Sequence, residues 1–394
     1  MNDALTQPEG PDEAGIGAGG EGPAGPPIGI RADQPPPPAD RSTLVATIGN
    51  VDKRFGAVRA LDRLNVDVPK AKITVLLGPN GAGKTTAIRM ITGAMSPDGG
   101  TVSVFGHDPT GPAGGYIRRK CGVVSAKPSL YDRLSGLDNL RYAAELYDLG
   151  RGAAVDRRIG QAAEQFGIDD ALDQRVGGYS TGMKTRLALA RSILHDPELL
   201  LLDEPTSGLD PESAQAVLAM VREMTTDGRS VLMCTHLLLE AEGPADEVGI
   251  IQDGTSLMGG DPTELASRYW PRPEGTITAR PAAALDQLHR MPEVLDVVPD
   301  GDRARVVLAD EAAIAEVIHG LSRAGVDLVA VEPHRPSLED LYFAVRREHE
   351  VDTADRGRDE RTDPTGLTAP HGRPAEPGRG GRAGRAGRRE LTNS

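Results

Sequence analysis

The chain has 394 residues, of which 48 are Gly and 31 are Pro, and its formal net charge is -14. The length allows two or more domains, whereas this much Gly and Pro exceeds what one compact fold uses. The acidic balance argues against a nucleic-acid binder, because a phosphate backbone attracts basic surfaces, and no nucleic-acid partner is expected.

Both ends of the chain are rich in Gly and Pro. Residues 1–42 include the four prolines Pro35–Pro38, and residues 352–394 are mainly Gly, Pro and Arg with few apolar side chains. Neither end buries enough apolar surface to offset the entropy of ordering its backbone, so we expect two disordered tails. The second tail is basic and has the charge to touch anionic lipid or RNA, but a solvated tail without a dedicated partner is the simpler interpretation.

The cysteines and the hydropathy indicate where in the cell the protein is expected to lie. Cys121 and Cys234 are far apart and lack CxxC spacing, so neither a disulfide framework nor a zinc site is predicted, and a reducing cytosol is expected. No run of about 18 apolar residues and no secretory signal pattern occurs. We therefore expect a chain that does not span a membrane, so that a role in transport would require another polypeptide for the channel.

Residues 43–270 alternate short apolar runs with helical segments, a pattern typical of an α/β domain around a mainly parallel buried sheet. The clearest strands are Ile73–Leu77, Leu199–Leu202 and Ser230–Cys234, which are continuously apolar or β-branched as in strands covered on both faces. Between Met183 and Leu194 apolar residues recur at helical spacing, which predicts a helix leading into the second of these strands.

A phosphate-binding loop follows the first strand. Its sequence GPNGAGKTT matches G-x-x-x-x-G-K-[ST] and comprises Gly78, Pro79, Asn80, Gly81, Ala82, Gly83, Lys84, Thr85 and Thr86. Glycines let successive backbone N–H groups point at phosphate oxygens, and the following helix N-terminus adds to the attraction. Lys84 is expected to reach the β- and γ-phosphates and Thr85 to bind Mg²⁺. ATP and Mg²⁺ are therefore the predicted cofactors, and a Gly-rich surface turn is the less favoured alternative.

Two acids and a histidine end the other two strands. Asp203 is expected to hold Mg²⁺ through water, and Glu204 to act as general base on the attacking water. His236 follows its strand at the same edge of a parallel sheet, where it is expected to contact the γ-phosphate and hold Glu204 in register. The predicted catalytic group is thus Glu204, His236 and Lys84; acids that cap a strand end and a structural histidine are the alternatives.

Residues 275–347 predict a smaller α+β domain with the order βαββαβ, the ferredoxin-like split unit. Its expected elements are strand 276–279, helix 283–290, strand 294–298, strand 305–308, helix 311–324 and strand 328–332. Asp300-Gly301 supplies a hairpin turn between the central strands. No second phosphate loop occurs, so the chain is expected to carry one ATPase domain rather than a tandem pair.

Together these motifs resemble the ATP-binding cassette (ABC) family over residues 44–270. GPNGAGKTT resembles its Walker A motif and LLLLDEP its Walker B motif, while SGLD at Ser207–Asp210 resembles the D-loop and Thr235-His236 the switch histidine. YSTGMK at Tyr179–Lys184 lies where the family has its signature. P-loop kinases, GTPases and helicases have no signature between the Walker motifs, so the ordered combination is specific.

The resemblance implies a P-loop NTPase domain with an ABC-type helical subdomain, acting as a head-to-tail dimer with a second ABC ATPase subunit, expected to be a homodimer. Ser180 and Gly182 of one subunit would bind the γ-phosphate held by Lys84 of the other, with Asp210 at the shared interface. Phe55 in KRFGAVRAL resembles the aromatic residue that stacks on adenine. Packing in the core is the alternative for Phe55.

Two residues depart from the family's pattern. Ala126 in GVVSAKPSLYDRL stands where the family usually has a glutamine that meets Mg²⁺ and water and relays the nucleotide state to the membrane subunit. Slow hydrolysis or altered coupling is therefore expected, with Ser125 or Lys127 as a partial substitute. Thr181 replaces the first signature glycine and adds a β-carbon near the expected phosphate of the partner.

PSLEDLYF at Pro336–Phe343 resembles the end of a small regulatory domain on exporters that pair with separately encoded ABC-2 type permeases, among them drug, antibiotic, sodium and polysaccharide exporters. The resemblance implies an ATP-hydrolysing exporter subunit, peripheral on the cytoplasmic face of the cell membrane, that drives export by ATP-dependent dimer closure. Residues 131–140 are expected to face the permease's coupling helix; a solvated helical insert is the alternative.

Two rival functions stay open. A regulatory ABC subunit with little turnover is one of them, and it stays open because of Ala126. A soluble ABC ATPase acting on ribosomes or DNA is the other rival, although such relatives usually carry two cassettes or a long coiled-coil insert, and the sequence has neither.

Overall fold

The computed structural model describes residues 43–359, and its central sheet has six strands in the order β5-β6-β7-β3-β8-β9. Their bounds are β5 (Cys121–Val124), β6 (Leu199–Asp203), β7 (Ser230–Thr235), β3 (Ile73–Leu77), β8 (Glu247–Gln252) and β9 (Thr255–Gly260). The first five strands are parallel, and β9 runs antiparallel to β8. Every residue of β3, β6 and β7 is buried, which explains their unbroken apolar runs and confirms the three predicted strands.

A second, antiparallel sheet with the order β2-β1-β4 was not predicted from the sequence. It consists of β1 (Leu44–Phe55), β2 (Val58–Pro69) and β4 (Gly99–Val104). Helix α1 (Lys84–Ile91) contacts both this sheet and β6 of the central sheet. Because α1 supplies Ala87, Ile88, Met90 and Ile91 to the core cluster that the two sheets share, the phosphate loop before it is anchored between them.

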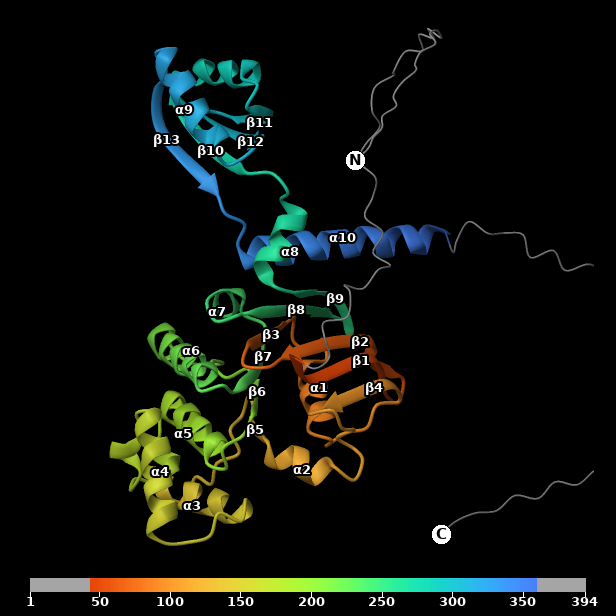
Figure 1. Ribbon diagram of the computed structural model, residues 1–394, viewed down its shortest axis with the longest axis vertical. Coiled ribbons are helices and arrows are strands. Elements are labelled where there is room, and N and C mark those ends of the chain that lie inside the picture. Colours follow the sequence, from red (N-terminus) through yellow and green to blue (C-terminus); the bar gives the residue numbers. More distant parts are fainter. Residues whose placement is uncertain (1–42, 360–394) are drawn as a thin grey trace, which may run out of the picture. The chain divides into compact units, whose positions relative to one another are not determined.

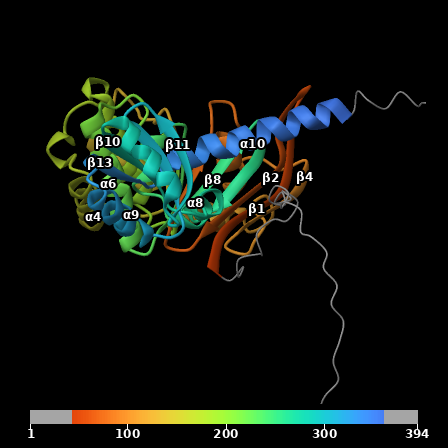
Figure 2. The same cartoon turned by 90° about the horizontal axis from the view of Figure 1, so that it is seen from above.

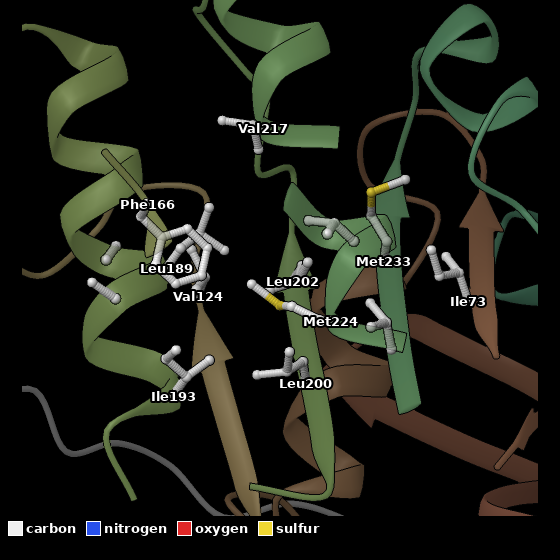
Figure 3. Close-up of a cluster of buried hydrophobic side chains, with 14 of the residues drawn as sticks. Ile73, Val124, Phe166, Leu189, Ile193, Leu200, Leu202, Val217, Met224 and Met233 are labelled. Atoms are coloured by element: carbon white, nitrogen blue, oxygen red, sulfur yellow. The ribbon is translucent and has the colours of Figure 1, made fainter. Parts of the chain in front are cut away.

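Helices α3 (Gly136–Leu146), α4 (Ala153–Gln165) and α5 (Thr181–Ile193) contact one another (Figure 1). α5 confirms the helix predicted between Met183 and Leu194, and it begins at Thr181 because the side chain of Ser180 caps its N-terminus. Figure 3 shows Leu189 and Ile193 of α5 among side chains from β5 and β6. This part of the chain also contains α2 (Gly114–Arg119), α6 (Pro211–Thr226) and α7 (Leu238–Glu242), with the 3-10 helices η2 (Asp169–Ala171) and η3 (Val176–Gly178).

The C-terminal part contains a four-stranded antiparallel sheet in the order β11-β12-β10-β13. Its elements are β10 (Glu274–Arg280), the 3-10 helix η4 (Ala282–Arg290), β11 (Val294–Asp300), β12 (Arg303–Leu308), α9 (Ala313–Arg323) and β13 (Asp327–His334). The expected element order is confirmed, and Gly301, with φ of 64°, forms the hairpin turn. The helix expected at 283–290 is a 3-10 helix, a geometry that puts the buried Leu285 and Leu288 on one face because it has three residues per turn.

Two further helices follow the central sheet, α8 (Pro262–Tyr269) and α10 (Leu338–Asp359), and they contact each other (Figure 2). α10 also contacts α7 and β9. Leu338, Leu341, Tyr342 and Val345 of α10 recur at helical spacing and are buried in the main core cluster.

The expected C-terminal tail begins inside α10. This helix continues to Asp359 and so runs past the boundary that was expected at residue 352. The rest of that expected tail, with residues 1–42, lies outside the described residues. Among the helices of residues 43–359, none combines the length and apolarity that a bilayer span requires.

Candidate functional site

The carboxyl ends of β3, β6 and β7 meet at one edge of the central sheet. Leu77 pairs with Thr235, and Asp203 pairs with Cys234. The backbone N–H of Gly78 donates to Thr235 O at 3.3 Å, and the N–H of the next acid, Glu204, donates to Cys234 O at 2.9 Å. The sheet register therefore brings the phosphate loop beside two strand ends that follow it by more than a hundred residues in the sequence.

Glycine is required in the phosphate loop for two physical reasons. Gly83 has φ of 108°, in a region that side chains disfavour, and it precedes the first residue of α1. A Cβ on Gly78 would lie 2.2 Å from Ile251 O, a contact that no side chain tolerates. Of the other predicted loop residues, Ala82 is buried, while Pro79, Asn80 and Gly81 are exposed at the outer turn and Thr86 lies half-buried in α1.

Lys84 is the buried cation of the site. Its Nζ donates to Gly78 O at 2.6 Å and to Pro79 O at 3.1 Å, and it forms an ion pair with Glu204 Oε1 at 3.1 Å. The side chains of Lys84 and Glu204 are only 6% and 12% exposed. The second oxygen of Glu204, Oε2, lies 2.6 Å from His236 Nδ1. All three residues predicted as catalytic are thus joined in one line of contacts.

Glu204 also has an unusual backbone. Its φ is 51°, in the left-handed region, where residues other than Gly are uncommon. This turn lets the carboxylate leave the strand end and reach both Lys84 and His236.

The residues predicted to bind a metal are also in contact. Thr85 Oγ1 donates to Asp203 Oδ2 at 2.7 Å, and Asp203 is 6% exposed. A hydroxyl and a carboxylate supply the oxygen ligands that Mg²⁺ prefers, and Mg²⁺ commonly takes only one or two protein ligands beside water and substrate phosphates. The donor set at this point therefore fits Mg²⁺.

The predicted signature and D-loop residues lie at the starts of α5 and α6. Ser180 Oγ accepts from Met183 N at 3.2 Å, and Asp210 accepts from Ser213 N at 2.9 Å. Hydrogen bonds from Ser213 lower the pKa of Asp210. A Cβ on Gly182 would lie 3.6 Å from Ser213 Oγ, so the two helix starts are neighbours. The hydrogen bonds of Ser180 and Asp210 go to their own helices and not to the phosphate loop of the same chain.

A cavity of about 80 Å³ adjoins the general-base candidate. It is lined by Glu204, Ala126, Thr181 and Lys184, together with Val124, Ser125, Pro128, Thr185, Pro205 and Ser207. Neither neighbour of Ala126 directs a free polar side chain there: Ser125 Oγ donates to Lys127 O at 2.9 Å, and Lys127 itself is exposed. The position of the family's usual glutamine thus borders Glu204 and carries only a methyl group.

Phe55 ends β1, and its side chain is 45% exposed. Lys53 Nζ lies 5.9 Å from the centre of its ring and also pairs with Asp98. This exposure contradicts the alternative of core packing and leaves a ring face available to a flat ligand.

A second cavity, of about 250 Å³, lies between β5 and α3. Its lining includes Tyr131, Tyr142, Tyr147, Leu146, Val123 and Arg191. The rings of Tyr131 and Tyr142 meet edge to face at 5.1 Å, and both side chains are about half exposed. The segment expected to face a membrane partner therefore contributes Tyr131 and Asn139 to a groove that also contains two further tyrosines.

Sequence reasoning missed one partly buried polar contact beside the site. The carboxylate of Glu240 in α7 accepts a hydrogen bond from Thr206 Oγ1, two residues after Glu204. A single acidic residue in a short helix carries no sequence signal of such a contact.

Comparisons with known proteins agree with these motifs. The protein-family model described as "ABC transporter" matches residues 61–207. Daunorubicin resistance ATP-binding protein DrrA3 of Streptomyces coeruleorubidus is 33% identical over 300 residues, which cover 75% of this chain and 94% of that protein. The ATP-binding protein NatA of Bacillus subtilis is 33% identical over 219 residues, covering 54% of this chain and 88% of that one.

A solved ATP-binding subunit of an ABC transporter superposes with a TM-score of 0.52 at 29% identity and covers 57% of this chain and 93% of that structure. The family match at residues 61–207 includes the phosphate loop and the β6 end with Asp203 and Glu204. The chain therefore belongs to the ABC transporter family, as an ATP-binding subunit of the group that includes DrrA3 and NatA.

Proposed function

We propose that this ATP-binding subunit hydrolyses ATP to drive export through a separately encoded ABC-2 type permease, at the cytoplasmic face of the cell membrane. The main support for ATP hydrolysis is the line of contacts from Lys84 through Glu204 to His236. Two relatives are named for resistance to the antibiotics daunorubicin and linearmycin, which favours a drug or antibiotic as cargo.

Each residue of this line has a proposed role. The loop from Gly78 to Thr86 binds the phosphates through its backbone N–H groups, and Lys84 exchanges its contact with Glu204 for the β- and γ-phosphates. Glu204 then accepts a proton from the attacking water as general base. His236 holds the Glu204 carboxylate in place from its other side and contacts the γ-phosphate.

We further propose that Thr85 and Asp203 hold Mg²⁺. The ion would neutralise the charge that develops on the phosphates. Asp203 is nearly buried, so its carboxylate is already oriented when nucleotide arrives. Phe55, with its exposed ring, stacks on the adenine.

A second copy completes each site in this proposal. The N-terminus of α5 with Ser180 and Gly182 presents unpaired backbone N–H groups, which suit the γ-phosphate bound by the other subunit. Asp210 lies at the shared interface beside this helix start. The aromatic groove around Tyr131 and Tyr142 receives the permease's coupling segment.

The domain organisation follows the same proposal: an ATPase domain at 43–270 and a regulatory domain at 275–347, whose last segment, in α10, packs into the main core cluster. The sheet order β11-β12-β10-β13 supports a ferredoxin-like split unit, because the two outer strands flank a central pair formed by the first and third strands of the βαββαβ order. Its regulatory role rests on the resemblance of its end to exporter subunits.

Steady-state ATPase rates of the full chain test the function. We expect measurable turnover in the wild type and loss of about a hundredfold or more in Glu204→Gln, because the amide cannot accept the water's proton. Lys84→Ala would lose ATP binding as well. Equal, negligible rates in the wild type and in Glu204→Gln would exclude the enzymatic function.

One observation favours the second candidate, a regulatory subunit with little turnover. Ala126 supplies no polar group to the cavity beside Glu204. We propose that hydrolysis is slowed for this reason, and that Ala126→Gln raises kcat. A kcat that is unchanged by this substitution, with a normal wild-type rate, would contradict the slowing.

A further inference from the structure

We propose that Glu240 is a positioning residue that holds the turn after Glu204 against the segment that carries His236. The inference rests on the roles proposed above for Glu204 and His236. Glu240 lies four residues after His236, in α7, so any bond from its carboxylate to the Glu204 turn ties the two catalytic segments together.

The contacts of Glu240 cross between these two segments. Its Oε2 accepts from Thr206 Oγ1 and lies 3.5 Å from Thr235 Oγ1, at the outer limit of a hydrogen bond. Thr235 Oγ1 in turn accepts from Leu237 N at 3.1 Å. Thr206 and Thr235 are 3% and 0% exposed. A buried hydroxyl needs a partner inside the protein, and a carboxylate is a strong acceptor.

The turn that Glu240 holds is closed within itself by a backbone hydrogen bond from Ser207 N to Glu204 O at 3.1 Å, and Glu240 links it to the His236 segment through a side chain. Glu204 has φ of 51°, a conformation that persists only where the surroundings impose it. Its N–H bond to Cys234 O fixes the start of the turn, and the Thr206 bond to Glu240 fixes the other side of Glu204. Without Glu240, these backbone bonds would remain, but the side-chain link that fixes the Glu204 turn relative to the His236 segment would be lost.

α7 itself is positioned by the C-terminal helix. A helix of five residues is not stable alone, so α7 depends on tertiary contacts. Ala241 is fully buried in the same core cluster as Leu341 and Tyr342 of α10, and Glu242 Oε1 accepts from Leu338 N at 3.3 Å. The position of Glu240 therefore depends on the packing of α7 against α10.

Steady-state ATPase kinetics of the full chain test this inference. Glu240→Ala is expected to lower kcat about tenfold while KM for ATP stays within about twofold, because the phosphate loop is untouched. Glu240→Gln retains a carbonyl acceptor for Thr206 and should restore most of kcat. Leu239→Ala is the matched control, since Leu239 lies in the same helix and is 80% exposed.

A double-mutant cycle separates positioning from general stability. Thr206→Val should lower kcat as Glu240→Ala does, and the double variant should lose little more. In a His236→Ala background, Glu240→Ala should have almost no further effect on kcat. Additive losses in either cycle, or a loss in Glu240→Ala that Glu240→Gln does not rescue, would overturn the inference.

Failure of the inference and failure of the proposed function give different results. If Glu204→Gln loses turnover while Glu240→Ala and Thr206→Val keep the wild-type kcat, the Glu240 inference is wrong and the function stands. If Glu204→Gln keeps the wild-type kcat, the proposed function is wrong. If Glu240→Ala does not fold, Glu240→Gln and Thr206→Val decide: a wild-type kcat in Thr206→Val overturns the inference.

Discussion

The buried ion pair between Lys84 and Glu204 predicts that Glu204→Gln binds ATP more tightly than the wild type although it no longer hydrolyses it. Lys84 Nζ lies 3.1 Å from Glu204 Oε1, and both side chains are nearly buried. The phosphate of an arriving ATP must displace this carboxylate from the ammonium group. Glutamine keeps the shape of the side chain and removes the competing charge.

The magnitude follows from the distance. At 3.1 Å and an effective dielectric constant of about 20, the Coulomb attraction is about 5 kcal/mol, which is an upper bound. The desolvation of two buried charges cancels most of this attraction, so the net stabilisation by the ion pair is about 1–2 kcal/mol. Since about 1.4 kcal/mol is a factor of ten, ATP affinity should rise by roughly 5- to 30-fold.

Isothermal titration of ATP into the wild type and Glu204→Gln measures this change. Glu164→Gln in α4 is the control, because it removes an exposed carboxylate far along the chain from the site. We expect tighter binding in Glu204→Gln alone, with a lower free energy of unfolding in the absence of ATP because the Lys84 charge loses its partner. Unchanged or weaker ATP binding would refute the reasoning that the ion pair competes with phosphate.

Three further substitutions test other parts of the structure. Gly78→Ala should destabilise the fold by about 1–3 kcal/mol in urea unfolding and weaken ATP binding, because its Cβ would meet Ile251 O at 2.2 Å. Leu341→Ala should cost about 2–5 kcal/mol, since Leu341 is 1% exposed; a smaller loss would mean that α10 is not part of the main core. Burial lowers the pKa of His195, so the free energy of unfolding should fall as the pH drops below the unfolded value near 6.5, by at most about 1.4 kcal/mol per pH unit. Urea unfolding at pH 7 and pH 5.5 should show this slope reduced in His195→Gln; an equal slope in both proteins would contradict it.

Much of the candidate site could be predicted from the sequence, because its physical requirements are local. β3, β6 and β7 are buried on both faces, which demands unbroken apolar runs that are visible in one dimension. The loop from Gly78 needs glycine where a Cβ would clash or where φ is positive, and these glycines are visible in the sequence. The element order of the C-terminal sheet could also be predicted, from the hydrophobic pattern of its strands and from the turn at Gly301.

Other features depended on the tertiary structure. The sheet β2-β1-β4 has irregular register with several shifts between β1 and β2, which blurs the alternation that would reveal its strands. Phe55 is exposed, and Glu240 contacts Thr206, because of the residues that surround each of them in space. The residues adjacent in sequence do not determine these surroundings.

The sequence by itself determined which chemical groups the site has: a phosphate loop with Lys84, two acids and a histidine at strand ends. Only the tertiary structure decided that Lys84 and His236 both contact the same carboxylate of Glu204. The physical reason is the pairing of β3 and β6 with β7, whose register brings groups from distant parts of the chain within hydrogen-bond reach.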